Sequence, residues 1–496
     1  MTGDQLNTLL QGVHALFVLN PFSDARANKE AEILAELGPP PSEPSKEPTF
    51  SPQLHTLIRW LETAEPELLK LGSAGKLPKK WNDALPSFAF FSLYHQVAAD
   101  LDRLIQRNQE DLPKNRALFR KVQDGIAERH TLIAHAPDRI WNRPEHLLAC
   151  FYQVRRAYYF IHHEIAGQSQ PIKTLRIQIW ESVFTKDMMS YQQWMYDAVG
   201  RFPTLVLGPS GSGKEVVARA IGLSRFIPYD IKAGHFITSA QASFHPVNLA
   251  ALSETLIESE LFGHRKGSFT GAMADRAGLF ATAGSYGTVF LDEIGEVSQA
   301  TQVRLLRLLQ SGEFQAIGDN HPAYFTGKVI AATHRDLNAE MRAGRFREDF
   351  YYRLCGDQVS TVALHDILRD RPEDLTTSVN YICTKLFGTE GAQHLCSRIL
   401  NTLQRDVPAD YTWPGNFREL EQAVRNIVVR DEYTPMPSHA DKSIDGILKG
   451  SHTTLAEWNR IYVQQAFKNA GSYREAARRL GVDQRTIKKW VSENGN

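Results

Sequence analysis

Hydrophobic positions recur with a helical period through the first third of the chain. Leucine, isoleucine and valine return every three or four residues, a spacing that gathers side chains on one face of a helix. Another run of this kind follows Pro144, and proline suits the first turn of a helix. Two clear series are Leu54, Leu57, Ile58 and Leu61, and Leu93, Val97, Leu101, Leu104 and Ile105. We therefore expect residues 1–166 to form a mainly α-helical domain.

The pattern changes after a short break at residues 167–171. Compact apolar runs typical of buried strands then alternate with helical stretches, and they occur at Thr204–Leu207, Thr288–Leu291 and Lys328–Thr333. This alternation predicts an α/β fold, a parallel sheet with helices on both faces. The expected segments are an α/β core at 172–362, a helical segment at 363–432, a linker at 433–452 and a small helical module at 453–496.

Composition limits the classes of protein without naming one. Equal numbers of basic and acidic residues, 56 of each, leave no net charge, so any contact with nucleic acid must come from a local patch. The four cysteines lie far apart without a C-x-x-C pair, which suits a reducing cytoplasm and offers no zinc-site spacing. No secretory signal and no run of ~18 apolar residues is evident, so we expect a cytoplasmic protein without a membrane span.

A glycine-rich loop follows the first apolar run of the α/β core. It consists of Gly208, Pro209, Ser210, Gly211, Ser212, Gly213 and Lys214, followed by Glu215. This fits the pattern G-x-x-x-x-G-K, in which backbone N–H groups point at phosphates and the lysine adds a positive charge. The general pattern has serine or threonine where Glu215 stands, so the loop alone is also compatible with a chance glycine-rich turn.

Two carboxylates end the next apolar run. Asp292 and Glu293 follow directly on Thr288–Leu291. In a nucleotide-hydrolysing site, the first carboxylate would hold Mg²⁺ and the second would orient and polarise the attacking water. A strand that ends in acids is common by itself, but together with the glycine-rich loop it predicts a site for ATP and Mg²⁺.

The longest recognisable stretch reads ESELFGHRKGSFTGA, over residues 258–272. It resembles the signature of the sigma-54-dependent transcriptional activators (bacterial enhancer-binding proteins), a family of AAA+ ATPases, with serine where that signature has alanine. In that family the end of this stretch projects from the ATPase and touches the sigma-54 form of RNA polymerase. The resemblance places the polymerase contact at Gly267, Ser268, Phe269, Thr270, Gly271 and Ala272, with an exposed Phe–Thr pair between flexible glycines.

The resemblance covers residues 172–430 and assigns further roles. Glu215 then matches a family trait, because a glutamate follows the lysine in these proteins too. Asn248 matches the asparagine that restrains the Walker B glutamate until nucleotide binds. Thr333 and His334 match the sensor I position, where asparagine is more usual than histidine.

Three arginines complete the ATP site by the same resemblance. Arg347 and Arg353 match the arginine fingers, which would reach the ATP of a neighbouring subunit, and Arg418 matches the sensor II arginine of a helical lid at 363–432. A guanidinium is always charged, as a developing phosphoryl charge requires. A site completed by a neighbour implies a homo-oligomer, and the family implies a ring, expected to be a hexamer, with a dimer as an inactive state.

The last segment carries a local basic patch. Residues 473–491 read YREAARRLGVDQRTIKKWV, which predicts a helix-turn-helix similar to the Fis-type module of many such activators. Six basic and two acidic residues lie between positions 472 and 490. The residues expected to meet double-stranded DNA are Gln484, Arg485, Thr486, Lys488 and Lys489. The alternative is a basic helical tail that only keeps the protein soluble.

The first 166 residues do not identify their own role. They lack the alternating βα pattern of a phosphorylatable receiver, so we expect them to sense an unidentified ligand or protein partner. Their histidines match no zinc motif. Residues 223–243 are longer than the family pattern, which indicates an insertion of unassigned role.

Two other classes of protein stay open. A AAA+ unfoldase that feeds a protease would carry the same ATP site but neither the GSFTGA loop nor a DNA-binding tail. A DNA-binding regulator with a vestigial ATPase would not need Lys214, Asp292 and Glu293 intact. The leading expectation is therefore an ATP-hydrolysing activator of sigma-54 RNA polymerase that is bound to upstream DNA.

Overall fold

The computed structural model describes residues 1–39, 52–106, 115–136 and 139–435, and near the C-terminal end residues 459, 462–464, 466–467 and 470–492. The chain divides into two compact units. One consists of Met1–Cys396 with Gly415–Val424, and the other of Ser397–Pro414 with Arg425–Asn496. No helix in the described ranges is long and apolar enough to cross a membrane.

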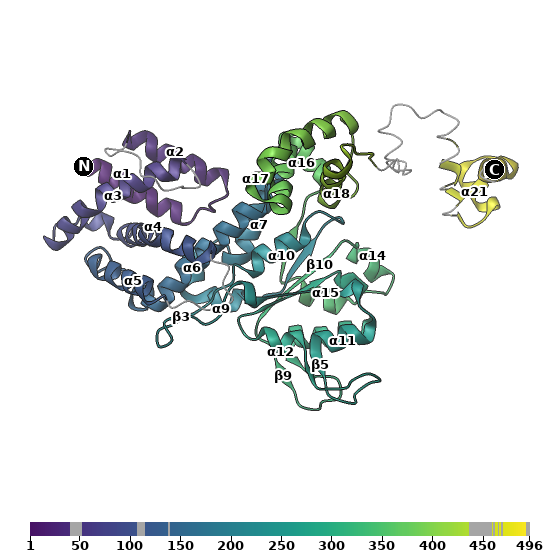
Figure 1. The fold of residues 1–496 in the computed structure, drawn as a ribbon, viewed down its shortest axis with the longest axis horizontal. Coiled ribbons are helices and arrows are strands. Elements are labelled where there is room, and N and C mark those ends of the chain that lie inside the picture. Colours follow the sequence, from purple (N-terminus) through teal and green to yellow (C-terminus); the bar gives the residue numbers. More distant parts are fainter. Residues whose placement is uncertain are drawn as a thin grey trace. The chain divides into compact units, whose positions relative to one another are not determined.

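A parallel five-stranded sheet lies at the centre of the first unit, in the order β11-β1-β10-β7-β4 (Figure 1). Its strands are β1 (Thr204–Leu207), β4 (Phe244–Asn248), β7 (Thr288–Asp292), β10 (Lys328–Thr333) and β11 (Asp357–Ser360). The three apolar runs expected to be strands are β1, β7 and β10, so this part of the prediction is confirmed. All five strands run in one direction, so their carboxyl ends meet at one edge of the sheet.

Successive residues of each strand face opposite sides of the sheet, and each side is buried. Leu205, Leu291 and Ala331 belong to the core formed with α11 (Glu254–Phe262), α12 (Leu279–Ala283), α13 (Gln299–Ser311) and α15 (Glu348–Leu354). Val206 and Phe290 face the other way, into the core formed with α6 (Pro144–Glu164), α7 (Gln170–Phe184) and α10 (Lys214–Gly222). Burial on both faces explains why these strands read as continuous apolar runs.

The first 166 residues are helical, as expected, and no strand precedes β1 in the described ranges. Their helices are α1 (Gly3–Phe17), α2 (Asp24–Leu37), α3 (Pro52–Ser73), α4 (Leu85–Gln106), α5 (Arg116–Glu128) and α6. Thr2 caps α1 in a reciprocal pair with Gln5, and Ser23 caps α2, which satisfies N–H groups that a helix start leaves open. Their core is continuous with the α6–α7–α10 side of the sheet, so the helices pack directly on the α/β core. The boundaries at 166 and 172 stay predictions.

The segment expected to be an insertion, 223–243, contacts these helices. It forms the hairpin of β2 (Tyr229–Asp230) and β3 (His235–Phe236). The Tyr229 ring stacks on Phe119 of α5 with centroids 5.0 Å apart, and Phe236 lies 4.2 Å from the Tyr152 ring of α6. The backbone N–H of Asn115 donates to the carbonyl of Gly234 at 2.8 Å. The insertion thus links the helical segment to the sheet.

A fully buried arginine fixes the base of this hairpin. Arg156 of α6 donates to the backbone carbonyls of Leu223, at 2.7 Å, and of Arg225, at 2.5 Å. Arg225 in turn donates to the carbonyl of Gly287, the residue just before β7. Buried carbonyls need such partners. A continuous hydrogen-bonded path therefore leads from α6 to the strand that carries Asp292.

Shorter elements connect these parts. After α7 come α8 (Met188–Ser190), a π-helical turn (Tyr191–Met195) and α9 (Tyr196–Val199), and α14 (Leu337–Arg342) follows β10. The predicted helical segment after the core contains α16 (Leu364–Asp370), α17 (Asp374–Asp406) and α18 (Asn416–Arg430). Gly388 interrupts α17 with a left-handed φ of 72°. The expected linker at 433–452 falls mostly outside the described residues.

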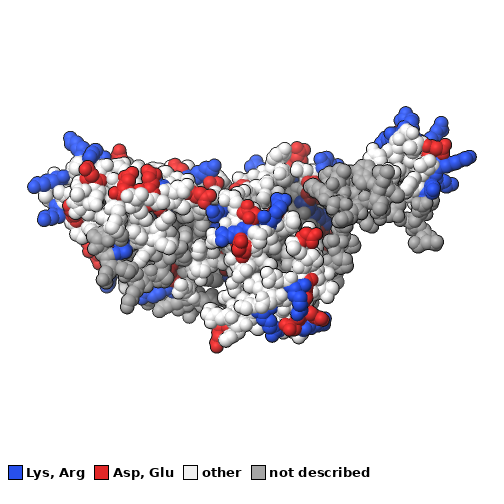
Figure 2. All heavy atoms as spheres, turned by 90° about the horizontal axis from the view of Figure 1, so that it is seen from above, with Lys and Arg blue, Asp and Glu red and all other residues white. Residues whose placement is uncertain are grey.

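The C-terminal module has its own small core. α21 (Tyr473–Leu480) ends at Gly481, whose φ of 65° makes the tight turn into α22 (Gln484–Ser492). Ala476, Ala477 and Ile487 are buried, with the Trp490 ring partly buried against them. Basic side chains gather on its outer surface (Figure 2). The helix-turn-helix geometry and its inward-facing residues match the prediction.

Candidate functional site

The glycine-rich loop joins the end of β1 to the start of α10, so the first N–H groups of that helix face the loop. Gly213 has a φ of +90°, and Gly211 a φ of +73°. A Cβ at position 211 would collide with the carbonyl oxygen of Gly415. Glycine is thus required at 211 by both backbone conformation and space, and the loop forms a backbone cradle.

Lys214 is held inside this cradle. Its Nζ donates to the carbonyls of Gly208 and Pro209, at 3.1 Å each. Burial lowers the pKa of Lys214, while the nearby carboxylates of Glu293 and Asp292 act in the opposite direction. The ammonium group therefore lies where a phosphate would meet it, close to both acids of β7.

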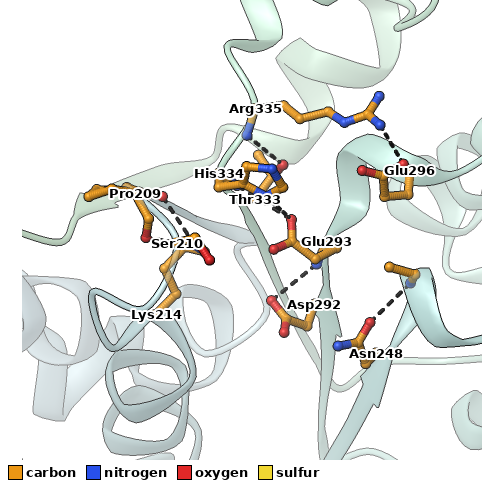
Figure 3. A network of polar contacts seen from close by, with 12 residues as sticks. Pro209, Ser210, Lys214, Asn248, Asp292, Glu293, Glu296, Thr333, His334 and Arg335 are labelled. Atoms are coloured by element: carbon orange, nitrogen blue, oxygen red, sulfur yellow. Dashed lines mark hydrogen bonds and ion pairs between the residues drawn. The ribbon is translucent and has the colours of Figure 1, made fainter. Parts of the chain in front are cut away.

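The two acids lie as predicted at the carboxyl end of β7, and they line the same cavity as Lys214 (Figure 3). The backbone N–H of Glu293 donates to Oδ1 of Asp292 at 3.1 Å. Burial, with the neighbouring charge of Glu293, raises the pKa of Asp292. Glu293 itself has a left-handed φ of 57°, a conformation rarely adopted by a residue with a long side chain.

Mg²⁺ is the metal that this pattern implies, and the residues fit it. Asp292 is half-buried and faces the side of the cavity where Lys214 lies (Figure 3). Mg²⁺ commonly binds through one or two carboxylates, with phosphate oxygens and water completing its shell. Asp292 would therefore hold the ion against the phosphates, and in the described part of the chain no larger cluster of His, Cys, Asp and Glu competes for it.

The partner of Glu293 differs from the one expected. The side chain of Asn248 does not reach Glu293; its Oδ1 accepts from the backbone N–H of Ala250 at 3.0 Å and caps the 3-10 turn Leu249–Ala251. Instead, Nδ1 of His334 lies 2.8 Å from Oε2 of Glu293 (Figure 3). The strand partner of Asn248 is Asp292, so the asparagine lies beside the acids while its Oδ1 caps its own turn.

His334 is held at this place by the end of β10. Thr333 is buried, and its Oγ1 accepts from the backbone N–H of Arg335 at 3.1 Å. The Arg335 side chain pairs with Glu296, just beyond the acids. The predicted sensor I pair thus lies next to Glu293, although Thr333 itself is enclosed.

Arg418 lies over the glycine-rich loop, as predicted. Its Nη1 donates to Oγ of Ser210 at 3.2 Å. The sequence did not point to Asn416, whose Nδ2 donates to the carbonyl of Ser210 at 3.0 Å while its Oδ1 accepts from the N–H of Leu364 at 2.8 Å. The start of α18 therefore closes on the loop through two side chains.

An apolar wall completes a cavity of about 280 Å³ beside the loop. Its apolar residues include Ile165, Ile172, Leu175, Val362, Ile382 and Phe417. The Tyr381 hydroxyl donates to Glu164 at 2.8 Å, which joins α17 to the end of α6. A flat aromatic base fits such a wall. The sequence missed the apolar lining residues because they come from three helices and two loops and share no motif.

The two expected arginine fingers do not face the cavity of their own chain. Arg347 directly precedes α15, and Arg353 lies on it. Both side chains are exposed, and neither lines the cavity. Arg347 pairs with Asp349 at 2.7 Å. Their outward position is the one that a role toward a neighbouring subunit requires.

The GSFTGA loop is the tip of a hairpin. Its stem is formed by β5 (Gly263–His264) and β6 (Arg276–Ala277), and the hairpin of β8 (Glu313–Phe314) and β9 (Ala323–Tyr324) lies on the same side of the sheet (Figure 1). The N–H of Gly267 donates to the carbonyl of Ala272 at 2.8 Å and closes the tip. Arg265 pairs with Asp275 and Asp319 and ties the two hairpins together.

Exposure within the tip is uneven. Thr270 is exposed as expected, whereas Phe269 is only half-exposed, because its ring rests edge-on against His264 with centroids 5.0 Å apart. Ser268 is partly buried and Ala272 is buried. Gly267 and Gly271 both have positive φ and open space around them. The Phe–Thr pair is thus a packed ring beside an exposed hydroxyl.

The expected DNA-contact residues share one exposed surface of α22. Gln484, Arg485 and Thr486 occupy its first turn, and Oδ1 of Asp483 accepts from the N–H of Arg485 at 2.7 Å. Lys488 and Lys489 are exposed one turn further on. Glu475 pairs with Arg478 and Arg479, so the basic character of the module is concentrated on α22.

Known proteins resemble this chain in its α/β core. Residues 183–360 match the family model of the Sigma-54 interaction domain. The chain is 38% identical over 298 residues to the transcriptional regulatory protein ZraR of Escherichia coli (strain K12), which covers 57% of this chain and 61% of ZraR. It is 42% identical over 236 residues to the Nif-specific regulatory protein of Klebsiella pneumoniae, covering 47% of this chain and 41% of that protein.

A solved structure of NtrX from Brucella abortus in complex with ATP is 19% identical, with a TM-score of 0.42, and covers 81% of this chain and 92% of that one. The sheet order and the matched domain define the α/β core as an AAA+ P-loop domain. In this region the chain is similar to sigma-54-dependent transcriptional activators. It spans about 61% of the length of ZraR, so this relative is not matched over its whole length.

Proposed function

We propose that this chain hydrolyses ATP to convert the closed complex of sigma-54 RNA polymerase into an open complex, while its C-terminal module is bound to upstream DNA. The observation that carries the proposal is the GSFTGA hairpin on the same domain as the cradle of Lys214, Asp292 and Glu293. A DNA-binding regulator with a vestigial ATPase would retain neither. A protease-linked unfoldase would not need the helix-turn-helix.

The chemistry is phosphoryl transfer to water. The loop N–H groups and Lys214 would bind the phosphates, and Mg²⁺ held by Asp292 would neutralise charge on their oxygens. Glu293 would take the proton of the attacking water as that oxygen approaches the γ-phosphorus, and ADP and phosphate would leave. Arg418, already over the loop, would add positive charge at the phosphates.

The arginines expected from a neighbour make the active enzyme an oligomer. Arg347 and Arg353 point outward, so they can stabilise the transferred phosphoryl group only in the site of another copy. We propose a ring, a hexamer in the active state, as in the family. Hydrolysis should then rise more steeply than linearly with protein concentration, because isolated chains lack the fingers.

A short path of strand pairing, chain and side-chain contact joins the acids to the hairpin. Asn248 pairs in register with Asp292, and the chain runs from Asn248 through one 3-10 turn into α11. At the end of α11, Ser259 contacts Nδ1 of His264 at 2.7 Å, and His264 supports the Phe269 ring. A displacement near the γ-phosphate could therefore move the tip that carries Thr270.

The substitution Thr270→Ala tests this proposal. Thr270 is exposed and does not line the cavity that holds Lys214, so ATP turnover should remain within about twofold of the wild type while open-complex formation with sigma-54 polymerase is lost. Thr376→Ala, an exposed change on α17, is the matched control and should keep both activities. Full transcription by Thr270→Ala would rule out the loop as the polymerase contact.

A further inference from the structure

A second cavity lies between the N-terminal helices and α7, away from the ATP site. Its volume is about 110 Å³, and it is bounded by α1, α2, α3, α4, α6 and α7. Aromatic rings dominate its wall, including Phe90, Phe91, Tyr94, Tyr158 and Trp180. An engineered cavity of about 150 Å³ in another protein stays dry and takes up benzene. This cavity is therefore of the size of one small ring.

Two arginines line the cavity, and each is already neutralised. Arg26 donates to Glu30 at 2.6 Å, and Arg155 donates from Nε and Nη2 to the two carboxylate oxygens of Asp102. The two guanidinium groups therefore add no uncompensated positive charge. Bringing an anion into so apolar a space would carry a desolvation cost without a free cation to offset it. The lining favours an uncharged molecule.

His95 is a polar group of the lining whose hydrogen-bonding capacity is unused among the described residues. Its ring contacts Phe91 and Tyr94 at centroid distances of 4.6 and 5.0 Å, but no residue in the described ranges hydrogen-bonds to either ring nitrogen. Burial, with Arg155 and Arg26 nearby, lowers the pKa of His95 to about 3. The imidazole is thus neutral at physiological pH and offers both a donor and an acceptor.

We propose that this cavity is the signal-binding site of the N-terminal segment, and that it takes a small, uncharged, largely apolar molecule of single-ring size with one hydroxyl or carbonyl group. The rings of the wall would enclose the apolar body, and His95 would hydrogen-bond to the polar group. The lining residues favour neither a phosphate, nor a metal, nor a charged ligand.

The same two helices line both cavities, which gives the ligand a route to the ATPase. Val154 and Tyr158 of α6 and Trp180 of α7 face the aromatic cavity. Toward the junction of these helices, Ile165 and Ile172 line the ATP cavity. Filling the first cavity would fix the packing of α6 against α7 and thereby the wall of the second. This coupling rests on the proposed ATPase function, whereas the binding site does not.

The test titrates the full chain with three probes, benzyl alcohol, toluene and benzoate, followed by calorimetry and saturation-transfer NMR. Benzyl alcohol should bind with a Kd of roughly a millimolar or tighter, as befits so small a molecule. Benzoate should bind at least about tenfold more weakly. Val154→Phe fills the cavity and should weaken benzyl alcohol binding by about tenfold or more, whereas Val18→Phe adds the same volume at an exposed position and should leave it unchanged.

A second variant keeps the test decisive if Val154→Phe does not fold. His95→Phe preserves the ring but removes the nitrogens, so benzyl alcohol should lose several-fold in affinity while toluene does not. Benzyl alcohol binding that is equal in the wild type and both cavity variants, or no saturable binding of any probe, would overturn the site. A ligand that binds but leaves the turnover of an active ATPase unchanged would overturn the coupling. If the chain hydrolyses no ATP, the proposed function fails while the titration still decides the site.

Discussion

Nδ1 of His334 lies 2.8 Å from Oε2 of Glu293, and the backbone N–H of His334 points at the same oxygen from 3.4 Å. An ionised carboxylate only accepts, so Nδ1 carries the proton when Glu293 is charged. The contact confines the glutamate to one orientation at the edge of the ATP cavity. This histidine therefore occupies the place where an asparagine was expected to act, and it does so from β10 rather than β4.

We expect His334 to position the general base. His334→Ala should lower kcat for ATP by about tenfold, because an unconstrained glutamate orients water poorly, while KM changes little. His334→Asn keeps a short N–H donor and should recover most of the rate. Steady-state kinetics of the wild type, His334→Ala and His334→Asn measure kcat and KM and so test this role. Faster turnover in His334→Ala would instead mean that the contact restrains the glutamate.

Asp292 should make stability depend on pH. Its pKa is raised, so the folded state disfavours the ionised carboxylate, and this lowers stability at every pH above the folded pKa. This loss of stability disappears as pH falls through the folded-state pKa of Asp292 toward about 4, the ordinary pKa of aspartate. Asp292→Asn should therefore raise the melting temperature near neutral pH and lose this advantage in acid.

Asp292→Asn should also lose the stabilisation that Mg²⁺ and ATP give to the wild type. Asp410→Asn, at an exposed position, is the matched control and should change neither quantity. Thermal scans with and without Mg²⁺ and ATP, over a series of pH values, measure both effects. A neutral-pH melting temperature lowered by Asp292→Asn would contradict the assignment of the carboxylate as a destabilised, metal-binding group.

Arg156 should hold the inserted hairpin to the helical segment. Arg156→Met leaves two buried carbonyls, those of Leu223 and Arg225, without their donor, so the free energy of unfolding should fall by about 2–4 kcal/mol. Arg120→Met, on the exposed side of α5, should change it by less than about 0.5 kcal/mol. Urea unfolding followed by circular dichroism provides the comparison. Equal changes in the free energy of unfolding for the two substitutions would contradict the structural role of Arg156.

The exposed side of α22 should bind DNA. Arg485→Ala, in the first turn, should weaken binding to the specific site by roughly 1–3 kcal/mol and relax its sequence preference. Lys488→Ala should weaken binding to all sequences alike and reduce the salt dependence by about one unit of slope. Arg474→Ala on α21 is the control. Fluorescence anisotropy at several salt concentrations separates these effects, and an affinity indifferent to all three changes would favour the solubilising tail.

Local motifs determined how much could be foreseen from the sequence. The strands β1, β7 and β10, the cradle of Lys214 and the two acids were predicted because each is a contiguous pattern with its own chemistry. The contact between Glu293 and His334 was not, because it depends on side-chain directions at the ends of two neighbouring strands. The insertion was seen as extra length, but its partner, Arg156, lies about seventy residues earlier and carries no motif.

In vitro transcription from a promoter with an upstream binding site, using RNA polymerase with either sigma-54 or the housekeeping sigma factor, tests the central claim most directly. Open complexes should form only with the sigma-54 enzyme, only with hydrolysable ATP, and not with Thr270→Ala or Glu293→Gln. Glu293→Gln should still bind ATP. Activation of the housekeeping polymerase, or open complexes formed with sigma-54 polymerase in the absence of ATP hydrolysis, would contradict the account.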